Sequence, residues 1–163
     1  MTNTYIISDT HFEHTNIIKY QHRPFKDVRD MDITMFNNWN SIVNCDDTVY
    51  FLGDLCMKHP RYWLENLNGN KIMIRGNHDK LLKNAHKYQI LNWNGENILL
   101  VHNPDFKPFE WTNWVIHGHH HNNEPNKYPL INNKLKTINV SVEMIDYTPI
   151  KLEKLLGMRD NVI

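Results

Sequence analysis

The sequence has few cysteines, no excess of charge of either sign and no long apolar run. Its two cysteines, Cys45 and Cys56, form no CxxC or zinc-binding pattern, so we expect two reduced, buried thiols rather than a redox site. Lysine plus arginine and aspartate plus glutamate are equal at 18 each, which argues against a global basic field for tight nucleic-acid binding. No run reaches the ~18 apolar residues of a membrane span. The first four residues lack a signal-peptide pattern, so no membrane partner and a cytoplasmic location are expected.

Histidine, by contrast, is abundant, with 11 among 163 residues. It is the commonest metal ligand and a frequent acid-base group, so the placement of these residues matters more than their number. The length favours one domain over residues 1–163, which is large enough to bury a core without stabilising disulfides or structural metals. No internal repeat, low-complexity tract or interdomain linker interrupts the chain.

Apolar, β-branched and aromatic runs predict six strands, over residues 4–8, 48–52, 71–75, 97–102, 114–117 and 137–143. The first five do not alternate with polar residues, so we expect them to be buried on both faces. In the last, Ile138, Val140 and Val142 alternate with Asn139, Ser141 and Glu143, which predicts one solvated face. The Asn94-Gly95 pair predicts a tight hairpin turn.

Helices are expected between and after these strands, over residues 29–43, 60–67, 80–87 and 150–156. For the last of them, Thr148 and Pro149 are a candidate N-cap and first helical residue, and Gly157 is a candidate C-terminal stop. The segment 122–134 is the longest predicted loop. Strands that alternate with helices, followed by hairpin-spaced strands, favour an α/β layered fold with mixed sheets.

Five short polar clusters follow the apolar runs directly. They are Asp9-Thr10-His11, Gly53-Asp54, Gly76-Asn77-His78-Asp79, His102 and Gly118-His119-His120-His121. Metal-ligating residue types at the carboxyl ends of successive buried strands are typical of an α/β enzyme site. The first four clusters also have a plain structural explanation when each is taken alone, such as a turn, a helix cap at Asp79 or a core histidine at His102. The histidine cluster at 117–121 is not easily explained in that way.

Taken together, the clusters supply two aspartates, one asparagine and four histidines as candidate metal ligands: Asp9, His11, Asp54, Asn77, His102, His119 and His121. In an extended turn, His119 and His121 face the same way. Seven ligands exceed the needs of one four-coordinate ion and suit two divalent ions that share a bridging carboxylate. A nitrogen and oxygen set without thiolate favours Mn, Fe, Zn or Ni in a catalytic role over a structural zinc site.

The ordered pattern D-x-H, G-D, G-N-H-D, a lone His and G-H-x-H, over residues 9–121, resembles the calcineurin-like metallophosphoesterases. The resemblance implies a sandwich of two mixed β-sheets flanked by helices, with a two-metal site at the strand ends. The first ion that it implies is held by Asp9, His11, Asp54 and His121. The second is held by Asp54, Asn77, His102 and His119, which makes Asp54 the bridge. His78 would lie just outside the metal ligands, oriented by Asp79, and both would be catalytic.

The activity that the resemblance implies is hydrolysis of phosphate esters, with manganese as the favoured metal. Two cations ~3.5–4 Å apart lower the pKa of a shared water, so that hydroxide attacks phosphorus, while His78 stabilises charge or protonates the leaving oxygen. Small members without a cap domain leave the metals open, which favours phosphodiesters, cyclic nucleotides and nucleotides. A phosphomonoesterase is the alternative, and a nuclease is disfavoured by the neutral charge. Some relatives have lost metal ligands and act as scaffolds, but every expected position is filled here.

The residues from Ser8 to Ile18, followed by Arg23-Pro24-Phe25, resemble a compact subgroup found in bacteria and their phages, which implies the cytoplasm of such a cell or infected host. The subgroup more usually has glycine in place of Glu13. Candidate substrate contacts in this segment are His14, Asn16 and Arg23, and a polar loop is the alternative for His14.

Further residues near the clusters bear on the shape of the pocket. After His102, Asn103-Pro104 departs from the Gly or aromatic residues of many relatives, which affects the pocket rather than the metals. His117 and His120 are expected beside the ligands or exposed. Trp111 and Trp114 could line a base-stacking wall, but filling the core is favoured.

Overall fold

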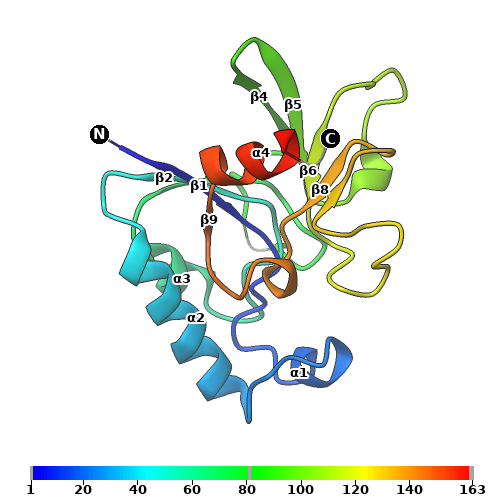
Figure 1. The fold of residues 1–163 in the computed structure, drawn as a ribbon. Helices are drawn as coiled ribbons and strands as arrows, with labels where there is room; N and C mark the ends of the chain where they lie inside the picture. The colour runs from blue at the N-terminus through cyan, green and yellow to red at the C-terminus, as the bar shows by residue number, and fades with distance from the viewer. Residues whose placement is uncertain (1, 81, 162–163) are drawn as a thin grey trace.

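A computed structural model describes residues 2–80 and 82–161, in which two mixed β-sheets form the centre of the fold (Figure 1). The first sheet has the order β3 (Asn70–Met73), β2 (Thr48–Phe51), β1 (Thr4–Ile7) and β9 (Ile150–Lys151). The second has the order β4 (Tyr88–Trp93), β5 (Glu96–Val101), β6 (Val115–His117), β8 (Thr137–Asn139) and β7 (Ile131–Asn132). Each sheet has parallel central pairs and an antiparallel edge, which confirms the predicted mixed α/β architecture.

One hydrophobic core joins the two sheets, because buried residues of β1 and β2 belong to the same cluster as Leu100, Ile116 and Ile138 of the second sheet. The helices that surround the sheets are α1 (Ile17–Tyr20), α2 (Val28–Ile42), α3 (Pro60–Asn66) and α4 (Leu152–Asp160), with short 3₁₀ turns η1 (Pro104–Phe106) and η2 (Val142–Met144). Burial of this apolar surface is the main driving force that fixes the sheets against each other.

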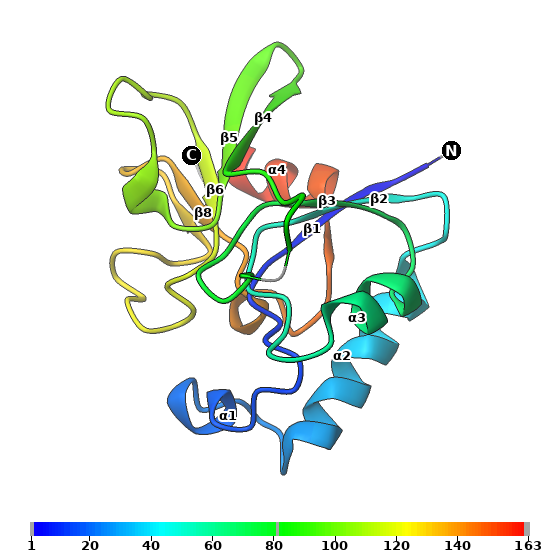
Figure 2. The ribbon, with the colours of Figure 1, turned by 180° about the vertical axis from the view of Figure 1, so that it is seen from behind.

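Helices α2 and α3 lie side by side against the first sheet (Figure 2). The apolar stripe of α2 is buried, and its Trp39 ring packs 6.1 Å from the Phe51 ring of β2. Asp27 caps this helix by accepting a hydrogen bond from the Asp30 backbone N–H, as an N-cap carboxylate does. From α3, Trp63 stacks on Phe12 with ring centroids 3.9 Å apart, so both helices are fixed close to the ends of the strands.

The helix predicted over 80–87 is wrong in the described residues, Lys80 and 82–87, which form turns and a single β-bridge. His86 bridges Ile74, with its N–H bonded to the Met73 carbonyl and its carbonyl accepting from Arg75. The edge of the first sheet thus recruits this segment and overrides its helical propensity. The predicted hairpin at Asn94-Gly95 is confirmed, with positive φ at both residues between β4 and β5.

The helix predicted over 150–156 begins later and ends later than expected. Ile150 instead pairs with Ile6 of β1, and the helix starts at Leu152 with Lys151 as its N-cap residue. Thr148 is not the N-cap, because its hydroxyl donates to the Asp146 carbonyl, and Gly157 lies inside the helix. An unpaired edge on β1 explains the change, since β9 supplies its missing partner strand.

Three further expectations need correction, two about burial and one about secondary structure. Cys56 is buried as expected, but Cys45 is exposed, and both thiols are free. Strand β3 is only partly buried because it lies at the edge of its sheet. The predicted loop 122–134 contains the short strand β7. Across residues 2–80 and 82–161, no helix combines the length and the apolar character that a bilayer crossing demands.

Gly157 offers a test of the packing around α4. A Cβ added there meets no atom within 4 Å, so Gly157→Ala should raise the stability by about 0.5–1 kcal/mol by reducing the entropy of the unfolded chain. The midpoint of urea unfolding measures this gain. In the matched variant Gly118→Ala, the added Cβ would overlap Ser8 Oγ and Asp9 Oδ2, so the midpoint should fall. Equal midpoints for the two variants would contradict this description of the packing.

Candidate metal centre

The polar clusters that follow the strands meet at one edge of the two sheets. Backbone hydrogen bonds join them directly: the Asp9 N–H donates to the Gly53 carbonyl at 2.9 Å, and the Gly118 N–H donates to the His102 carbonyl at 3.0 Å. The close approach depends on glycine, because a Cβ on Gly76 would overlap the Asp54 carboxylate. Segments far apart in the sequence therefore share one site, as expected from the strand-end pattern.

Two buried aspartates form its centre. Asp9 Oδ2 accepts hydrogen bonds from Ser141 Oγ at 3.0 Å and from the His119 N–H at 2.9 Å, whereas Asp9 Oδ1 has no hydrogen-bond partner. Asp54 Oδ1 accepts from the His78 N–H at 2.8 Å, and its Oδ2 faces the histidines. Burial raises the pKa of Asp54. At Asp9 burial acts in the same direction, but the neighbouring histidines outweigh it and lower the pKa.

His11 and His121 flank the free oxygen of Asp9. The Nε2 atoms of His11 and His121 lie 3.9 and 3.8 Å from Asp9 Oδ1, and these three residues form a group whose ligand atoms could bind one metal ion. Both ring nitrogens of His11 are buried without a hydrogen-bond partner. Burial lowers the pKa of His11 well below its ordinary value, so the ring is neutral and presents a lone pair. Unpaired buried acceptors that face one another fit a cation between them.

His102 forms the second group with Asp9 and Asp54. Its Nδ1 lies 2.8 Å from the Leu52 carbonyl, which can only accept, so Nδ1 carries the hydrogen and Nε2 presents a lone pair. That Nε2 lies 3.5 Å from Asp54 Oδ2 and 3.3 Å from His119 Nδ1. The Asn77 amide lies 3.2 Å from the same His119 nitrogen. The structure thus brings five of the candidate ligands into two groups that share Asp9, and it places His119 beside His102 and Asn77 beside His119.

Asp54 Oδ2 lies between the two groups. It is 3.5 Å from His11 Nε2 on one side and 3.5 Å from His102 Nε2 on the other. A single carboxylate oxygen with this placement is what a bridging ligand between two ions requires. Asp9 also contributes to both groups, which the sequence pattern did not indicate.

Sequence reasoning missed the residues that support this centre from β8 and η2. Asn139, Ser141 and Glu143 were expected on a solvated face, but the side chains of Asn139 and Ser141 are fully buried and that of Glu143 is 2% exposed. Glu143 lies 3.0 Å from His121 Nδ1, so it fixes the ring with Nε2 toward Asp9. Burial lowers the pKa of His121, but the Asp9 and Glu143 carboxylates outweigh burial and raise it. The available signal was the alternation of polar and apolar residues over 137–143. Its polar face contacts the site and is not exposed to solvent.

Arg23 is buried beneath the site, which corrects its predicted contact with substrate. Its guanidinium donates to the backbone carbonyls of Asp9 and Thr10 at 2.7 and 2.8 Å, and its Nε lies 2.8 Å from Glu143 Oε1. With its donors taken by the protein, Arg23 holds the first motif in place. Of the other two candidates, His14 is half-buried and Asn16 is exposed. The His14 ring is 6.4 Å from the His78 ring, and Asn16 is exposed at the start of α1.

Asp79 has a different role from the one expected. Both of its carboxylate oxygens accept backbone hydrogen bonds, from Asp54 at 2.7 Å, from Gly76 at 2.8 Å and from Leu55 at 3.0 Å. Within the described part of the chain it makes no hydrogen bond to the His78 ring. It therefore clamps the Gly53-Asp54 turn to the Gly76–Asp79 turn and positions Asp54. The His78 side chain is 47% exposed, with Nε2 3.9 Å from Asp54 Oδ2.

The backbone at the site is strained. Five of the seven candidate ligands have positive φ although they are not glycine: Asp9, His11, Asp54, His119 and His121. Each such residue costs of order 1 kcal/mol or more and persists only where the surroundings over-determine it. This clustering is typical of functional sites. His117 and His120 lie apart from the two groups, with His117 buried and His120 paired to Glu124 at 3.0 Å.

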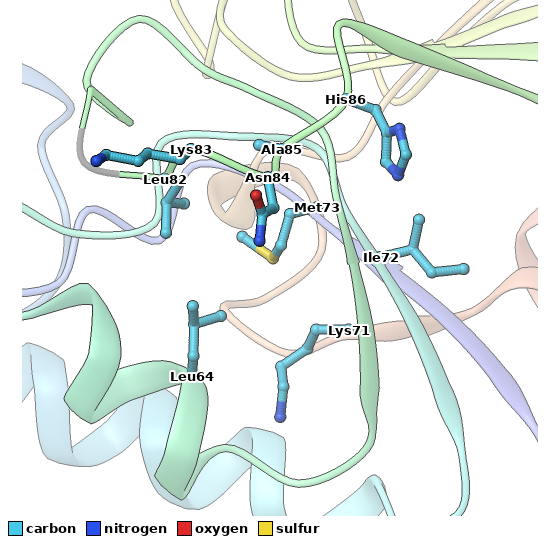
Figure 3. Close-up of a pocket in the computed structure, with 9 residues that line it drawn as sticks. All are labelled: Leu64, Lys71, Ile72, Met73, Leu82, Lys83, Asn84, Ala85 and His86. Carbon is cyan, nitrogen blue, oxygen red and sulfur yellow. The ribbon is translucent and has the colours of Figure 1, made fainter.

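Two hollows near the site differ in their relation to it. A cavity of about 490 Å³ lies between α3 and the segment 82–86 (Figure 3), and none of the candidate ligands is among the described residues that line it. A second, of about 420 Å³, is lined by Asn77 and His102 and is therefore continuous with the metal-ligand groups.

No protein-family model matches the chain. It is 48% identical over 164 residues to the uncharacterized protein MJ1445 of Methanocaldococcus jannaschii, an alignment that covers 97% of this chain and 92% of that protein. The solved structure of AQ665, a protein of unknown function from Aquifex aeolicus, is 30% identical and superposes with a TM-score of 0.73 over 97% of this chain and 100% of that one. The Gene 66 protein of Mycobacterium phage L5 is 33% identical over 102 residues, which is 57% of this chain and 49% of that protein.

The near full-length matches establish that this chain, MJ1445 and AQ665 are members of one family. All five motifs occur in order, and they meet at the strand ends of two mixed sheets around two groups of metal-ligating residues. This is the arrangement that the sequence resemblance to the calcineurin-like metallophosphoesterases implies.

Proposed function

We propose that the protein is a phosphodiesterase that uses two divalent metal ions, with manganese favoured, to hydrolyse nucleotide-type phosphate esters. Asp9, His11, Asp54 and His121 would hold one ion, and Asp54, Asn77, His102 and His119 the other. Two ions bound there would supply positive charge for the phosphoryl oxygens and lower the pKa of a water.

The observation that carries this proposal is the set of buried acceptors that face one another. Asp9 Oδ1 and His11 Nε2 are both without hydrogen-bond partners, at a separation of 3.9 Å. On the other side, the lone pair of His102 Nε2 faces Asp54 Oδ2 at 3.5 Å. Leaving such groups unpaired costs several kcal/mol, a cost that bound cations would remove.

The chain's own residues supply the remaining functions. Glu143 and Arg23 hold His121 and the Asp9 backbone, so the ligand atoms keep their positions without reorganisation. His78 is the group placed to move a proton, because its ring is half-exposed at the mouth of the site and its backbone is fixed by Asp54. It would protonate the leaving oxygen of the ester.

The variant Asp54→Asn tests whether Asp54 bridges the two ions. Asp54→Asn keeps an oxygen that can accept from the His78 N–H but removes the charge between the two ion positions, so we expect loss of both ions. Metal content after dialysis, measured by plasma emission, checks this, with circular dichroism as the measure of folding. The exposed Asp46→Asn variant is the matched control. A folded Asp54→Asn protein that retains two ions would rule out the bridge.

Glu143 tests the support of His121. Glu143→Gln should weaken metal affinity by about 10- to 100-fold, because the ring loses the carboxylate that orients it and raises its basicity. Isothermal titration with Mn²⁺ measures the affinity, and thermal unfolding without metal reports separately on the lost contact with Arg23. Glu153→Gln, at an exposed position of α4, should bind as the parent does. An unchanged affinity in Glu143→Gln would remove this residue from the metal centre.

His78 tests the proton transfer. His78→Ala should retain both ions and lose about 10²–10⁴-fold in kcat toward bis(p-nitrophenyl) phosphate, since a positioned acid-base group contributes that much. His86→Ala, an exposed histidine outside the metal centre, is the control. Parent-like turnover in His78→Ala would exclude it from the reaction. No Mn²⁺-dependent turnover of either mono- or diester in the parent would overturn the proposed function itself.

A further inference from the structure

The hollow beside the second ligand group has a lining suited to part of a substrate. Its volume of about 420 Å³ falls in the lower part of the range for small-molecule sites, ~300–1,000 Å³. Asn77 and His102 form one wall, and the remaining described residues that line it are Arg75, Gly76, Lys87, Tyr88, Val101, Asn103 and Phe106. A molecule with its phosphate at the metal centre would therefore extend into this hollow.

Two aromatic side chains are exposed where they line it. Tyr88 is 50% exposed and Phe106 is 75% exposed, so both rings present apolar surface at the hollow. The tryptophans considered for base stacking lie elsewhere: Trp111 and Trp114 pack against the core clusters, as the core interpretation expected. Tyr88 and Phe106 are thus the aromatic side chains that line this hollow beside the second ligand group.

Phe106 is held in position rather than left on a loose loop. The Asn103 side chain accepts from the Asp105 N–H at 2.9 Å and caps η1, and the Phe106 N–H donates to the Asn103 carbonyl at 3.1 Å. Asp105 is in turn bound by the Tyr128 hydroxyl at 3.2 Å. The Asn103-Pro104 departure noted in the sequence therefore builds a rigid turn that places a phenyl ring one turn after His102.

The charge of the lining is positive. Arg75 and Lys87 are cationic, and none of the described residues that line the hollow is acidic. Arg75 is fixed because its Nη2 donates to the Leu82 and Lys83 carbonyls at 3.1 and 3.2 Å. Within the described residues no hydrogen bond is formed by its Nε or Nη1, which could donate to an anion. Planar guanidinium donors suit phosphate oxygens.

We propose that this hollow binds the nucleoside portion of the substrate, with the base stacked on Phe106 and Tyr88 and a second phosphate group facing Arg75 and Lys87. The inference rests on the proposed function and narrows its substrate class to nucleotide phosphodiesters that carry a further phosphate. Stacking of bases on aromatic side chains is tolerant of sequence, so the site would select for the presence of a base more than for its identity.

Two p-nitrophenyl esters separate the nucleoside from the leaving group. The p-nitrophenyl ester of thymidine 5′-phosphate and ethyl p-nitrophenyl phosphate release the same phenolate, but only the first has a nucleoside. Phe106→Ala and Tyr88→Ala should each lower kcat/KM for the thymidine ester by roughly 5- to 150-fold, the usual effect of removing a stacking partner. The ethyl ester should be hydrolysed at the parent rate. The control is Phe109→Ala, an exposed ring on the same segment outside the hollow.

The role of the Arg75 and Lys87 charges is tested with the thymidine ester that carries an added 3′-phosphate. The parent should prefer it to the unphosphorylated ester, and Lys87→Ala and Arg75→Ala should abolish that preference, whereas exposed Lys107→Ala should not. If Phe106→Ala and Tyr88→Ala lower kcat/KM equally for the thymidine and ethyl esters, the rings contact the leaving group instead of the base. If neither variant lowers kcat/KM for either ester, stacking is excluded. Each result overturns the inference. Both leave the proposed function intact, because that fails only if the parent hydrolyses neither ester.

Discussion

Two carboxylates, Asp9 and Asp54, are buried close together, and most of the local structure follows from the need to compensate for them. Burying a charge costs several kcal/mol unless hydrogen bonds or opposite charge offset it. One oxygen of Asp9 accepts hydrogen bonds from the Ser141 hydroxyl and the His119 N–H, and one oxygen of Asp54 accepts a hydrogen bond from the His78 N–H. In each case the other oxygen is turned toward histidine nitrogens. The protein thus donates hydrogen bonds to one oxygen of each carboxylate, and a cation would fit beside the other.

Holding that arrangement requires backbone conformations that would be unfavourable elsewhere. Positive φ at Asp9, His11 and Asp54 bends each turn so that successive polar side chains point to the same side. Buried cross-links hold these turns: Asp79 accepts three backbone N–H groups, and Arg23 donates to two backbone carbonyls. Two residues expected to be catalytic or substrate-binding are therefore structural supports. Charged residues next to the candidate metal centre can therefore act only as supports for its backbone.

The strand pattern and the motifs were enough to predict two mixed sheets and the convergence of seven side chains, because parallel strands end at a common edge. The supporting network could not be predicted in the same way. Alternation in 137–143 has two physical meanings, solvent on one face or a polar site on one face, and only the tertiary structure shows that Ser141 and Glu143 face Asp9 and His121. Likewise, the helical propensity of 80–87 loses to pairing between His86 and the edge at Ile74, a long-range effect.

The same edge that recruits this segment also connects the reactive centre to the neighbouring hollow. His86 pairs beside Arg75, the next two residues are Lys87 and Tyr88, and Tyr88 begins the antiparallel pair with β5, whose end leads to His102. The ligand His102 and the lining residues Tyr88 and Phe106 thus belong to one continuous piece of structure around β5. Changes at Lys87, at Tyr88 or in η1 could alter the lining of the hollow while the carboxylates, which follow β1 and β2, keep their positions. The carboxylates that would support hydrolysis are therefore distinct from the aromatic and cationic side chains that would select the ester.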